Sequence, residues 1–379
     1  MSNETNTRGS ADHSLVAPRD KRLLTLVAGS VLAVLAAGFV QVWFGSYDMT
    51  VAKTFSVVTN PRIVFNPDVW AAALLGNEFP EWMTTPQIIV WNIRMPRVFI
   101  GILVGMNLAV SGAVFQAVTR NELASPYILG VSGGAGLAVL LTLVFFSSAY
   151  VVLPIVGIQF SALPFAAAVG GSLAFFLVYA IAWQGGTSPV RLVLAGVIVA
   201  TIFQSLQTGL FYFLDSTAAV KTAIAWTTGS LTGVDWEQFR LAGLPTLFVV
   251  PAIFLASRHL NVLLLGEDTA RSLGMSVERV RFGVSTLAIL AAATAVSVAG
   301  LVGFVGLVVP HAVRTVVGSD YRRLVLGSIF LGPALVVVAD VVARLALMPV
   351  QVPVGIVTGL IGGPYFLYLM RRNGNVSEF

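Results

Sequence analysis

The charged side chains that could carry chemistry are concentrated in one short segment, residues 258–281, which long apolar runs flank on both sides. Glu267 and the acid that follows it favour the N-terminus of a helix, and Arg271 lies at the i+4 spacing of an ion pair. Gly274 can end that helix, and a second short helix can begin over 277–281. Because such regularity exceeds what a surface loop needs, we predict a charged knob that docks onto a soluble partner.

Catalytic and metal-binding signatures are absent from the sequence. It contains no HExxH, GxSxG or Walker A pattern, and none of its three lysines follows a glycine, which excludes a GK[ST] phosphate loop. It has no cysteine, and its three histidines are far apart in the chain. We therefore expect no enzyme activity and no cofactor or metal on this chain, so that any nucleotide-driven work would use a site on another chain.

The composition is that of a membrane protein with several spans. Of 379 residues, 57% are hydrophobic and 10% charged, whereas a soluble domain has roughly 25% charged residues. The net charge of +5 is too modest to indicate a nucleic-acid partner. Apolar runs of about 17–25 residues can cross a bilayer as helices. We predict ten of them, at residues 23–44, 96–118, 128–149, 162–183, 191–213, 240–257, 282–300, 302–317, 323–345 and 352–371.

These runs predict one transmembrane domain over 23–372, because proline and glycine rather than long linkers separate them. A disordered polar tail is expected at 1–22 and a short C-terminal tail at 373–379. The longest polar insertion, 45–91, contains an apolar stretch at 69–76 that is typical of an interfacial helix.

The lysines and arginines indicate the orientation. With the N-terminus in the cytoplasm, the cytoplasmic segments hold 15 of these residues and the opposite side holds 7. The protein is therefore expected in the cell membrane, as a multi-pass protein with both termini and segment 258–281 in the cytoplasm.

Few polar groups lie within the predicted spans. Asp340 and Arg344 are one helical turn apart, which predicts an ion pair with a structural or docking role. His311 has no carboxylate, histidine or cysteine near it in the sequence, and we interpret it as a helix-end packing or capping residue. An ion-driven transporter usually needs a buried carboxylate path, and no such path is evident.

Two segments interrupt the apolar pattern at the ends of predicted spans. Segment 120–136 contains a proline and several glycines and predicts a broken or re-entrant helix, which membrane depth tolerates only where protein or water covers it. Segment 94–97, Arg-Met-Pro-Arg, indicates either an interface anchor or a docking contact for an acidic soluble protein.

Two further patterns are the spacing of small residues and a weak internal sequence similarity. Gly101 and Gly105 have GxxxG spacing, as do the glycines that follow Gly355, and they indicate either packing within the chain or a seam between copies. Segments 111–116 and 299–304 resemble each other and lie in spans of opposite direction, as in the inverted repeats of transporters.

Several motifs occur in order between residues 90 and 371. They are Arg94-Met-Pro-Arg97, Ser111-Gly112 with Gln116, Arg120-Asn121, Leu129-Gly-Val-Ser132, Gly266-Glu-Asp-Thr-Ala-Arg-Ser-Leu-Gly274, Gly303-Phe-Val-Gly-Leu-Val-Val-Pro-His311, Gly318-Ser-Asp320 with Arg322, and Val352-Pro-Val-Gly-Ile-Val-Thr358. Together they are highly specific. By them the chain resembles the permease subunits of ABC importers for iron–siderophores, haem and vitamin B12.

The resemblance implies an all-α, type II ABC importer permease with ten transmembrane helices in two five-helix inverted-repeat halves. It also implies a homodimer of permease copies with a translocation path along its axis. Two ATP-binding subunits, which hold ATP and Mg, would dock on the cytoplasmic side, and an extracytoplasmic substrate-binding protein would dock opposite.

The resemblance further implies residue roles. Arg94 and Arg344 would meet acidic residues of the binding protein, and the cytoplasmic gate would be lined by Asn121, Leu123, Thr187 and Ser188. A coupling helix that enters a cleft of the ATPase would comprise Gly266, Glu267, Asp268, Thr269, Ala270, Arg271, Leu273 and Gly274. The chain has Glu122 where the family usually has proline, which weakens the carry-over of the gate role.

The cargo is expected to be a metal chelate. A path poor in His, Cys, Asp and Glu suits a bulky, already chelated metal better than a bare ion. Segments 233–236 and 339–347 look closest to vitamin B12 permeases, so cobalamin is the first expectation, by a small margin over iron–siderophores, with haem third. Two other classes stay open: an ion-coupled secondary transporter that acts without an ATPase, and a membrane scaffold for a soluble complex.

Overall fold

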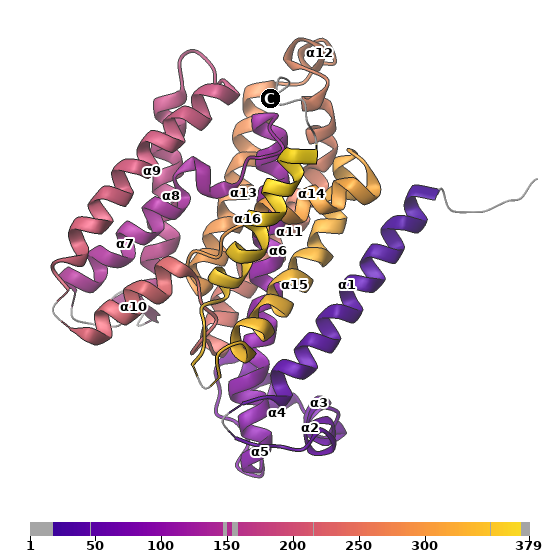
Figure 1. Cartoon of the computed structure of the whole chain (residues 1–379), viewed down its shortest axis with the longest axis vertical. Helices are drawn as coiled ribbons and strands as arrows, with labels where there is room; N and C mark the ends of the chain where they lie inside the picture. The colour runs from indigo at the N-terminus through magenta and orange to yellow at the C-terminus, as the bar shows by residue number, and fades with distance from the viewer. Residues whose placement is uncertain are drawn as a thin grey trace, which may run out of the picture.

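The computed structural model describes residues 18–45, 47–146, 150–153, 158–214, 216–348 and 350–372. Long helices run side by side between two ends of the molecule, with α12 at one end and α2–α5 at the other (Figure 1). The long helices are α1 (Pro18–Trp43), α6 (Met95–Thr119), α7 (Val131–Phe145), α8 (Ala162–Ala182), α9 (Pro189–Phe211), α11 (Trp236–Leu264), α13 (Val277–Ala299), α14 (Val305–Val317), α15 (Tyr321–Leu345) and α16 (Val354–Arg372).

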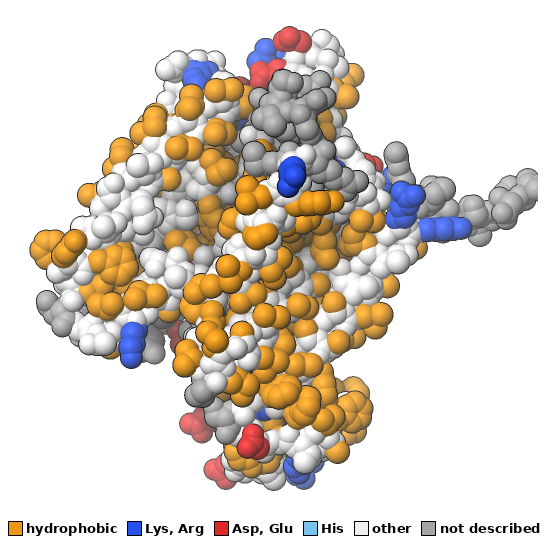
Figure 2. Space-filling view, in the orientation of Figure 1, with side chains coloured by type: hydrophobic (Ala, Val, Ile, Leu, Met, Phe, Trp, Pro, Cys, Tyr) orange, Lys and Arg blue, Asp and Glu red, His pale blue; other side chains and the backbone are white. Residues whose placement is uncertain are grey.

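Seven of these helices are long and apolar enough to cross a membrane. The shorter apolar helices α7, α14 and α16 lie in the other three predicted runs. The expectation of an all-helical bundle of apolar spans is thus confirmed, whereas the ten-span count and the inverted repeat stay predictions. Figure 2 shows hydrophobic side chains over the middle of the visible face and most charged side chains near its two ends.

The ends of the chain differ from the predicted boundaries. Helix α1 begins at Pro18 rather than at residue 23, because proline fits the first turn of a helix and Asp20 there favours the helix N-terminus. The rest of the predicted N-terminal tail and the tail at 373–379 lie outside the described residues. Helix α1 begins, and α16 ends, toward the end of the bundle that carries α12 (Figure 1).

Short elements fill the connections. The predicted insertion 45–91 contains α2 (Val51–Val58), α3 (Pro61–Val64), α4 (Pro67–Leu75) and α5 (Thr85–Ile88), and a short π-helix, η1 (Ile89–Arg94), joins α5 to α6. Helix α4 matches the helix expected at 69–76. Helix α10 (Thr217–Thr228) follows α9, and a hairpin of β1 (Tyr150–Leu153) and β2 (Ile158–Ser161) lies between α7 and α8.

Helix α6 lies at the centre of the bundle and packs against α15, α13 and α11. A Cβ atom on Gly105 would overlap the Gly332 carbonyl of α15, and one on Gly112 would overlap the Gly306 carbonyl of α14. These glycines therefore let backbones touch, and the Gly101–Gly105 pair packs within the chain.

The interrupted helix expected at 120–136 is present. The 3₁₀ turn η2 (Pro126–Leu129) ends at Gly130, whose φ of +85° a side chain would strain, and α7 starts directly after it. This break lets the chain re-enter the bundle after the loop 120–125.

Candidate functional site

The helix predicted at 267–274 forms at one end of the bundle as α12 (Glu267–Ser272). Gly266 precedes it with a φ of +103°, and Gly274 follows Leu273 with a φ of +81°. The N–H of Gly274 donates to the Arg271 carbonyl, and that of Met275 to the Ala270 carbonyl, which closes the C-terminus.

The side chains of α12 point largely to the outside. The Asp268 side chain is fully exposed, Arg271 is 58% exposed, and Leu273 is 64% exposed, while Ala270 alone on this helix is buried. Arg271 pairs with Glu267 at 3.3 Å, as the i+4 spacing predicted, and with Asp268 at 3.7 Å. Thr269 is exposed as well.

The second short helix predicted after Gly274 is wrong in one respect. Residues 277–281 are the first turns of α13, a continuous helix that runs to Ala299. The apolar run from residue 282 continues the same helix because no proline interrupts the hydrogen bonding at this junction, and a single glycine, Gly283, is tolerated inside a long helix. The charged segment is therefore a short helix joined by a turn to a long one.

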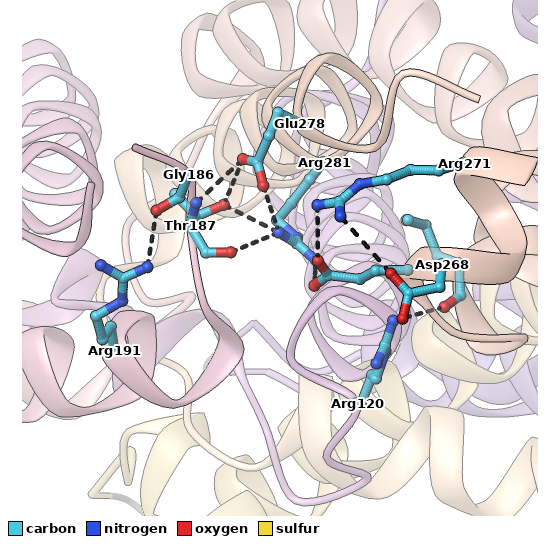
Figure 3. A network of polar contacts seen from close by, with 10 residues as sticks. Arg120, Gly186, Thr187, Arg191, Asp268, Arg271, Glu278 and Arg281 are labelled. Atoms are coloured by element: carbon cyan, nitrogen blue, oxygen red, sulfur yellow. Dashed lines mark hydrogen bonds and ion pairs between the residues drawn. The ribbon is translucent and has the colours of Figure 1, made fainter. Parts of the chain in front are cut away.

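Arg281 on α13 connects α12 to the loop between α8 and α9. Its Nη2 donates to Glu267 at 2.5 Å, and its Nη1 donates to the Thr187 carbonyl at 2.6 Å and to Glu278 at 2.9 Å. The Glu278 carboxylate in turn accepts from the Thr187 N–H at 3.2 Å and hydroxyl at 2.8 Å. Figure 3 shows Thr187, Glu278 and Arg281 converging beside α12.

Burial strengthens this network. Arg281 is 1% exposed and Thr187 is 4% exposed. Partial burial by itself raises the pKa of Glu267, but the hydrogen bond from Arg281 and the charges of Arg281, Arg120 and Arg271 outweigh it, so that the pKa is lowered. Glu267 is therefore an ionised partner of Arg281 at neutral pH.

The loop that contains Thr187 is compact. Its Gly185 and Gly186 have positive φ angles, and Trp183 and Thr187 form a β-bridge. Arg191, in the first turn of α9, donates to the Gly186 carbonyl at 2.9 Å. Ser188, the N-cap residue of α9, is half-buried.

The predicted gate residues Asn121 and Leu123 lie on the other loop of this end, 120–125. The Asn121 side chain accepts from the Leu123 N–H at 2.8 Å, which holds a tight turn. Arg120 donates to the Leu263 carbonyl of α11 at 3.2 Å, close to the start of α12. Loop 120–125 thus contacts the end of α11, three residues before segment 266–274, and the loop with Thr187 is joined to Glu267 through Arg281.

Glu122 has partners that no local spacing indicated. Its carboxylate lies 3.3 Å from Arg314 Nη1 and 3.6 Å from His311 Nδ1, both on α14. The polar contact with His311 is the main reason that the pKa of Glu122 is lowered; desolvation opposes it and the Arg314 charge supports it. His311 is therefore inside α14 and faces a carboxylate, rather than capping a helix end. Among the described residues no group of three metal-binding side chains occurs.

At the opposite end, the predicted Asp340–Arg344 pair is wrong. Asp340 binds Arg97 on α6 instead, with Arg97 Nε 2.7 Å from Oδ2 and Nη2 2.9 Å from Oδ1, and it also accepts from Gln41. Arg344 donates to the Gln41 carbonyl at 2.8 Å. Arg97 on the neighbouring helix donates to both oxygens of the buried carboxylate, which is a stronger contact than the predicted one from Arg344 on the same helix.

Arg94, predicted to meet a binding protein, is only 4% exposed. It donates to the carbonyls of Val42 at 2.6 Å, Trp43 at 2.7 Å and Tyr47 at 2.7 Å, and so closes the C-terminus of α1. Arg94 thus makes a structural contact that neither interpretation of segment 94–97 included, and the docking role remains untested.

Sequence reasoning missed two features. Arg281 and Glu278 were inside segment 258–281, but their contact with Thr187 joins residues 94 and 91 positions apart, and no local pattern indicates it. The second feature was visible as i, i+3, i+4, i+7 spacing within an apolar run. It is an exposed polar stripe on α9, formed by Thr201, Gln204, Ser205 and Thr208.

Comparisons with known proteins agree with this architecture. The model of the FecCD transport family matches residues 26–372. The cobalamin import system permease protein of Halobacterium salinarum is 43% identical over 305 residues, which cover 79% of this chain and 77% of that protein. The iron(3+)-hydroxamate import system permease protein of Bacillus subtilis is 36% identical over 295 residues, which cover 78% and 87%.

A solved structure described as an inward-facing conformation of a metal-chelate type ABC transporter superposes with a TM-score of 0.75 at 26% identity, covering 92% of this chain and 99% of that one. The match of nearly the whole chain to one family model, together with two relatives above 30% identity, leads to a plain conclusion: this multi-pass membrane protein belongs to the FecCD transport family.

Proposed function

We propose that this chain is the transmembrane permease subunit of a type II ATP-driven importer for a bulky metal chelate. The observation that carries the proposal is the exposed, charged helix α12 at one end of an apolar bundle whose sequence has no nucleotide-binding loop. A structure of this kind offers a docking element to a motor on another chain. The relatives named above are import permeases for metal chelates, which supports the same reading.

The proposed assembly contains two copies of this chain, two ATP-binding subunits and one extracytoplasmic substrate-binding protein. The α12 end would face the cytoplasm, which agrees with the distribution of lysine and arginine, and the end with α2–α5 would face outward. Both described ends of the chain, α1 and α16, approach the α12 end, and this fits two cytoplasmic termini.

The proposed mechanism is alternating access. Closure of the ATPase dimer would displace α12. The contact of Glu267 with Arg281 would pass this displacement to the loop with Thr187. The contact of the Leu263 carbonyl with Arg120 would pass it to the loop with Asn121. The gate at this end would open as the loops separate from their counterparts in the second copy. The chain makes and breaks no covalent bond.

The proposed cargo is cobalamin first, then an iron–siderophore, then haem. The stripe on α9 supports a cargo with peripheral hydrogen-bonding groups, because the exposed Gln204 amide has no hydrogen bond to the described residues, and an unpaired polar group is unfavourable against lipid and suits a path. Cobalamin carries many amide groups, and siderophores carry hydroxamate, catecholate or carboxylate oxygens, whereas haem has two carboxylates on an apolar ring.

The test is uptake by proteoliposomes that contain the permease with its cognate ATPase and binding protein. We expect cobalamin to stimulate ATP hydrolysis and to accumulate inside, with ferric hydroxamates and haem giving weaker stimulation. A different order among the three chelates would change the assignment of the cargo and would leave the importer proposal in place. Uptake that continues in vesicles without the ATPase subunit would overturn the importer proposal in favour of an ion-coupled transporter.

A further inference from the structure

We infer that Arg281 is the positioning residue that couples α12 to the loop 183–188 and, through it, to α9. The inference rests on the proposed function, because it names the route by which displacement of α12 would reach the path. Arg281 is 1% exposed and so lies beneath the surface that a partner or a cargo could reach, where it bonds Glu267, Glu278 and Thr187.

The first step is the rigidity of the link between α12 and Arg281. A short charge-assisted contact of 2.5 Å joins Arg281 Nη2 to Glu267, the first residue of α12. The side chain of Arg281 is 2% exposed, so water cannot replace Glu267 as its partner without opening the protein. When α12 shifts, Arg281 must therefore follow it or lose a buried partner, which is costly for a charged group.

The second step is the link from Arg281 to the loop. Thr187 is held through three of its groups: its carbonyl accepts from Arg281, while its N–H and hydroxyl donate to Glu278. Glu278 also accepts from Arg281 at 2.9 Å. Three acceptors on separate segments thus share one guanidinium, as Figure 3 shows for Thr187, Glu278 and Arg281, and the planar fork of arginine fixes their mutual geometry.

The third step leads from the loop to α9. Arg191 in the first turn of α9 donates to the Gly186 carbonyl and to the Gln184 side chain, both at 2.9 Å. A movement of Thr187 is therefore transmitted to the N-terminal end of α9, and the exposed stripe begins ten residues further along the same helix, at Thr201. This series of contacts joins the docking helix to the candidate path without passing through the apolar core.

The decisive experiment compares Arg281→Lys and Arg281→Met with the matched control Arg279→Met. Arg279 lies on the same turns of α13 and is exposed. Each variant is assembled with its ATPase and binding protein in proteoliposomes, and cobalamin imported per ATP hydrolysed is measured. We expect the ratio to fall at least tenfold in Arg281→Met, to fall partly in Arg281→Lys, and to stay within twofold of wild type in Arg279→Met.

A second readout separates coupling from folding. The chain has no cysteine, so spin labels can be placed at Ser272→Cys on α12 and at Val190→Cys, an exposed position in the first turn of α9, and their separation measured by pulsed EPR with and without ATP. We expect one narrow distance in both states with Arg281, and an ATP-dependent, broadened distance in Arg281→Met. Where Arg281→Met does not assemble, Glu278→Gln and Thr187→Val remove one link each and are expected to lower the ratio severalfold.

Failure of this inference and failure of the proposed function give different results. If the wild-type complex imports cobalamin and the Arg281 variants, together with Glu278→Gln, keep the wild-type ratio and narrow distance, Arg281 is not the link. If the wild-type complex hydrolyses no ATP in response to any of the three chelates and imports none, the proposed function fails instead.

Discussion

Arg97 on α6 and Asp340 on α15 form a forked ion pair near the end of the bundle that carries α2–α5. Both carboxylate oxygens accept from the guanidinium, at 2.7 and 2.9 Å, and the two side chains are 9% and 0% exposed. Gln351 accepts a further hydrogen bond from Arg97 at 2.9 Å. The pair therefore locks α6 against α15, where the glycine contacts already bring the two backbones together.

Breaking this pair from one side should be strongly destabilising. Asp340→Asn leaves the Arg97 charge buried without its counterion, and we expect a loss of about 3–5 kcal/mol in the free energy of unfolding. Thermal unfolding of the detergent-solubilised chain measures it. The double variant Arg97→Met with Asp340→Leu removes both charges and should recover most of the loss; a double variant as unstable as Asp340→Asn would contradict this account.

The hydrogen bonds by which Arg94 closes the C-terminus of α1 should contribute more to stability than its positive charge does. Arg94→Lys keeps the positive charge, but its single nitrogen cannot occupy both positions from which Arg94 Nη1 reaches Val42 and Trp43 and Nη2 reaches Tyr47. We expect it to lower the free energy of unfolding by about 1–3 kcal/mol, because buried carbonyls lose their donors. Affinity for the binding protein should change little in Arg94→Lys. A large loss of affinity with unchanged stability would show that Arg94 serves docking instead.

The sequence predicted those elements whose determinants are local. Helix α12 was placed correctly because acids at its start and Gly274 at its end act within one turn. The apolar spans were found because hydrophobic length is a property of a continuous run. The same reasoning missed the strands β1 and β2 between two predicted runs, which pair in register with Tyr150 opposite Ser161.

Contacts between distant segments could not be read from spacing. The i+4 rule paired Asp340 with Arg344, but Arg97 on another helix offers two donors in the plane of the carboxylate and so takes its place. His311 on α14 likewise contacts Glu122, which lies on a loop distant in the sequence. In both cases the geometry in three dimensions decides which residue meets the carboxylate, and one sequence carries no information on which residue that is.

Glu122 should contribute stability only where it is ionised. Its pKa is lowered from the ordinary 4.5, chiefly through His311. A depressed carboxyl pKa gives stability that is fully present above the unfolded-state pKa of about 4.3 and that is lost as pH falls through the folded-state pKa. The melting temperatures of wild type and Glu122→Gln should therefore differ by a constant amount at pH 6–8, and the difference should shrink as the pH falls below the unfolded-state pKa. A difference that does not shrink at all in acid would exclude the ion pair as its source.

A proline at position 122 tests how the family's usual residue fits this turn. Within the described chain the Glu122 N–H donates no hydrogen bond, and the turn is held by Asn121 and Leu123. We expect Glu122→Pro to assemble and to lose only the contacts with α14. Asn121→Ala, which removes the acceptor for the Leu123 N–H, should disturb the loop more, and ATP turnover without cargo, measured in proteoliposomes, should rise in that variant alone. Equal basal turnover in both variants would argue against a role of this turn in the gate.

The stripe on α9 should contact cargo through Gln204. Thr201, Ser205 and Thr208 each donate to a carbonyl one turn back, so their hydroxyls are already satisfied, whereas the exposed Gln204 amide makes no hydrogen bond to the described residues. Loss of one neutral hydrogen bond corresponds to about 0.5–1.5 kcal/mol, or about two- to tenfold in apparent affinity. We expect Gln204→Leu to raise the KM for cobalamin uptake by that factor and to leave complex assembly intact.

Leu206→Met, a conservative change at an apolar position that is 51% exposed on the same helix, is the control. An unchanged KM in Gln204→Leu, with wild-type transport per ATP, would place the cargo path away from this face of α9.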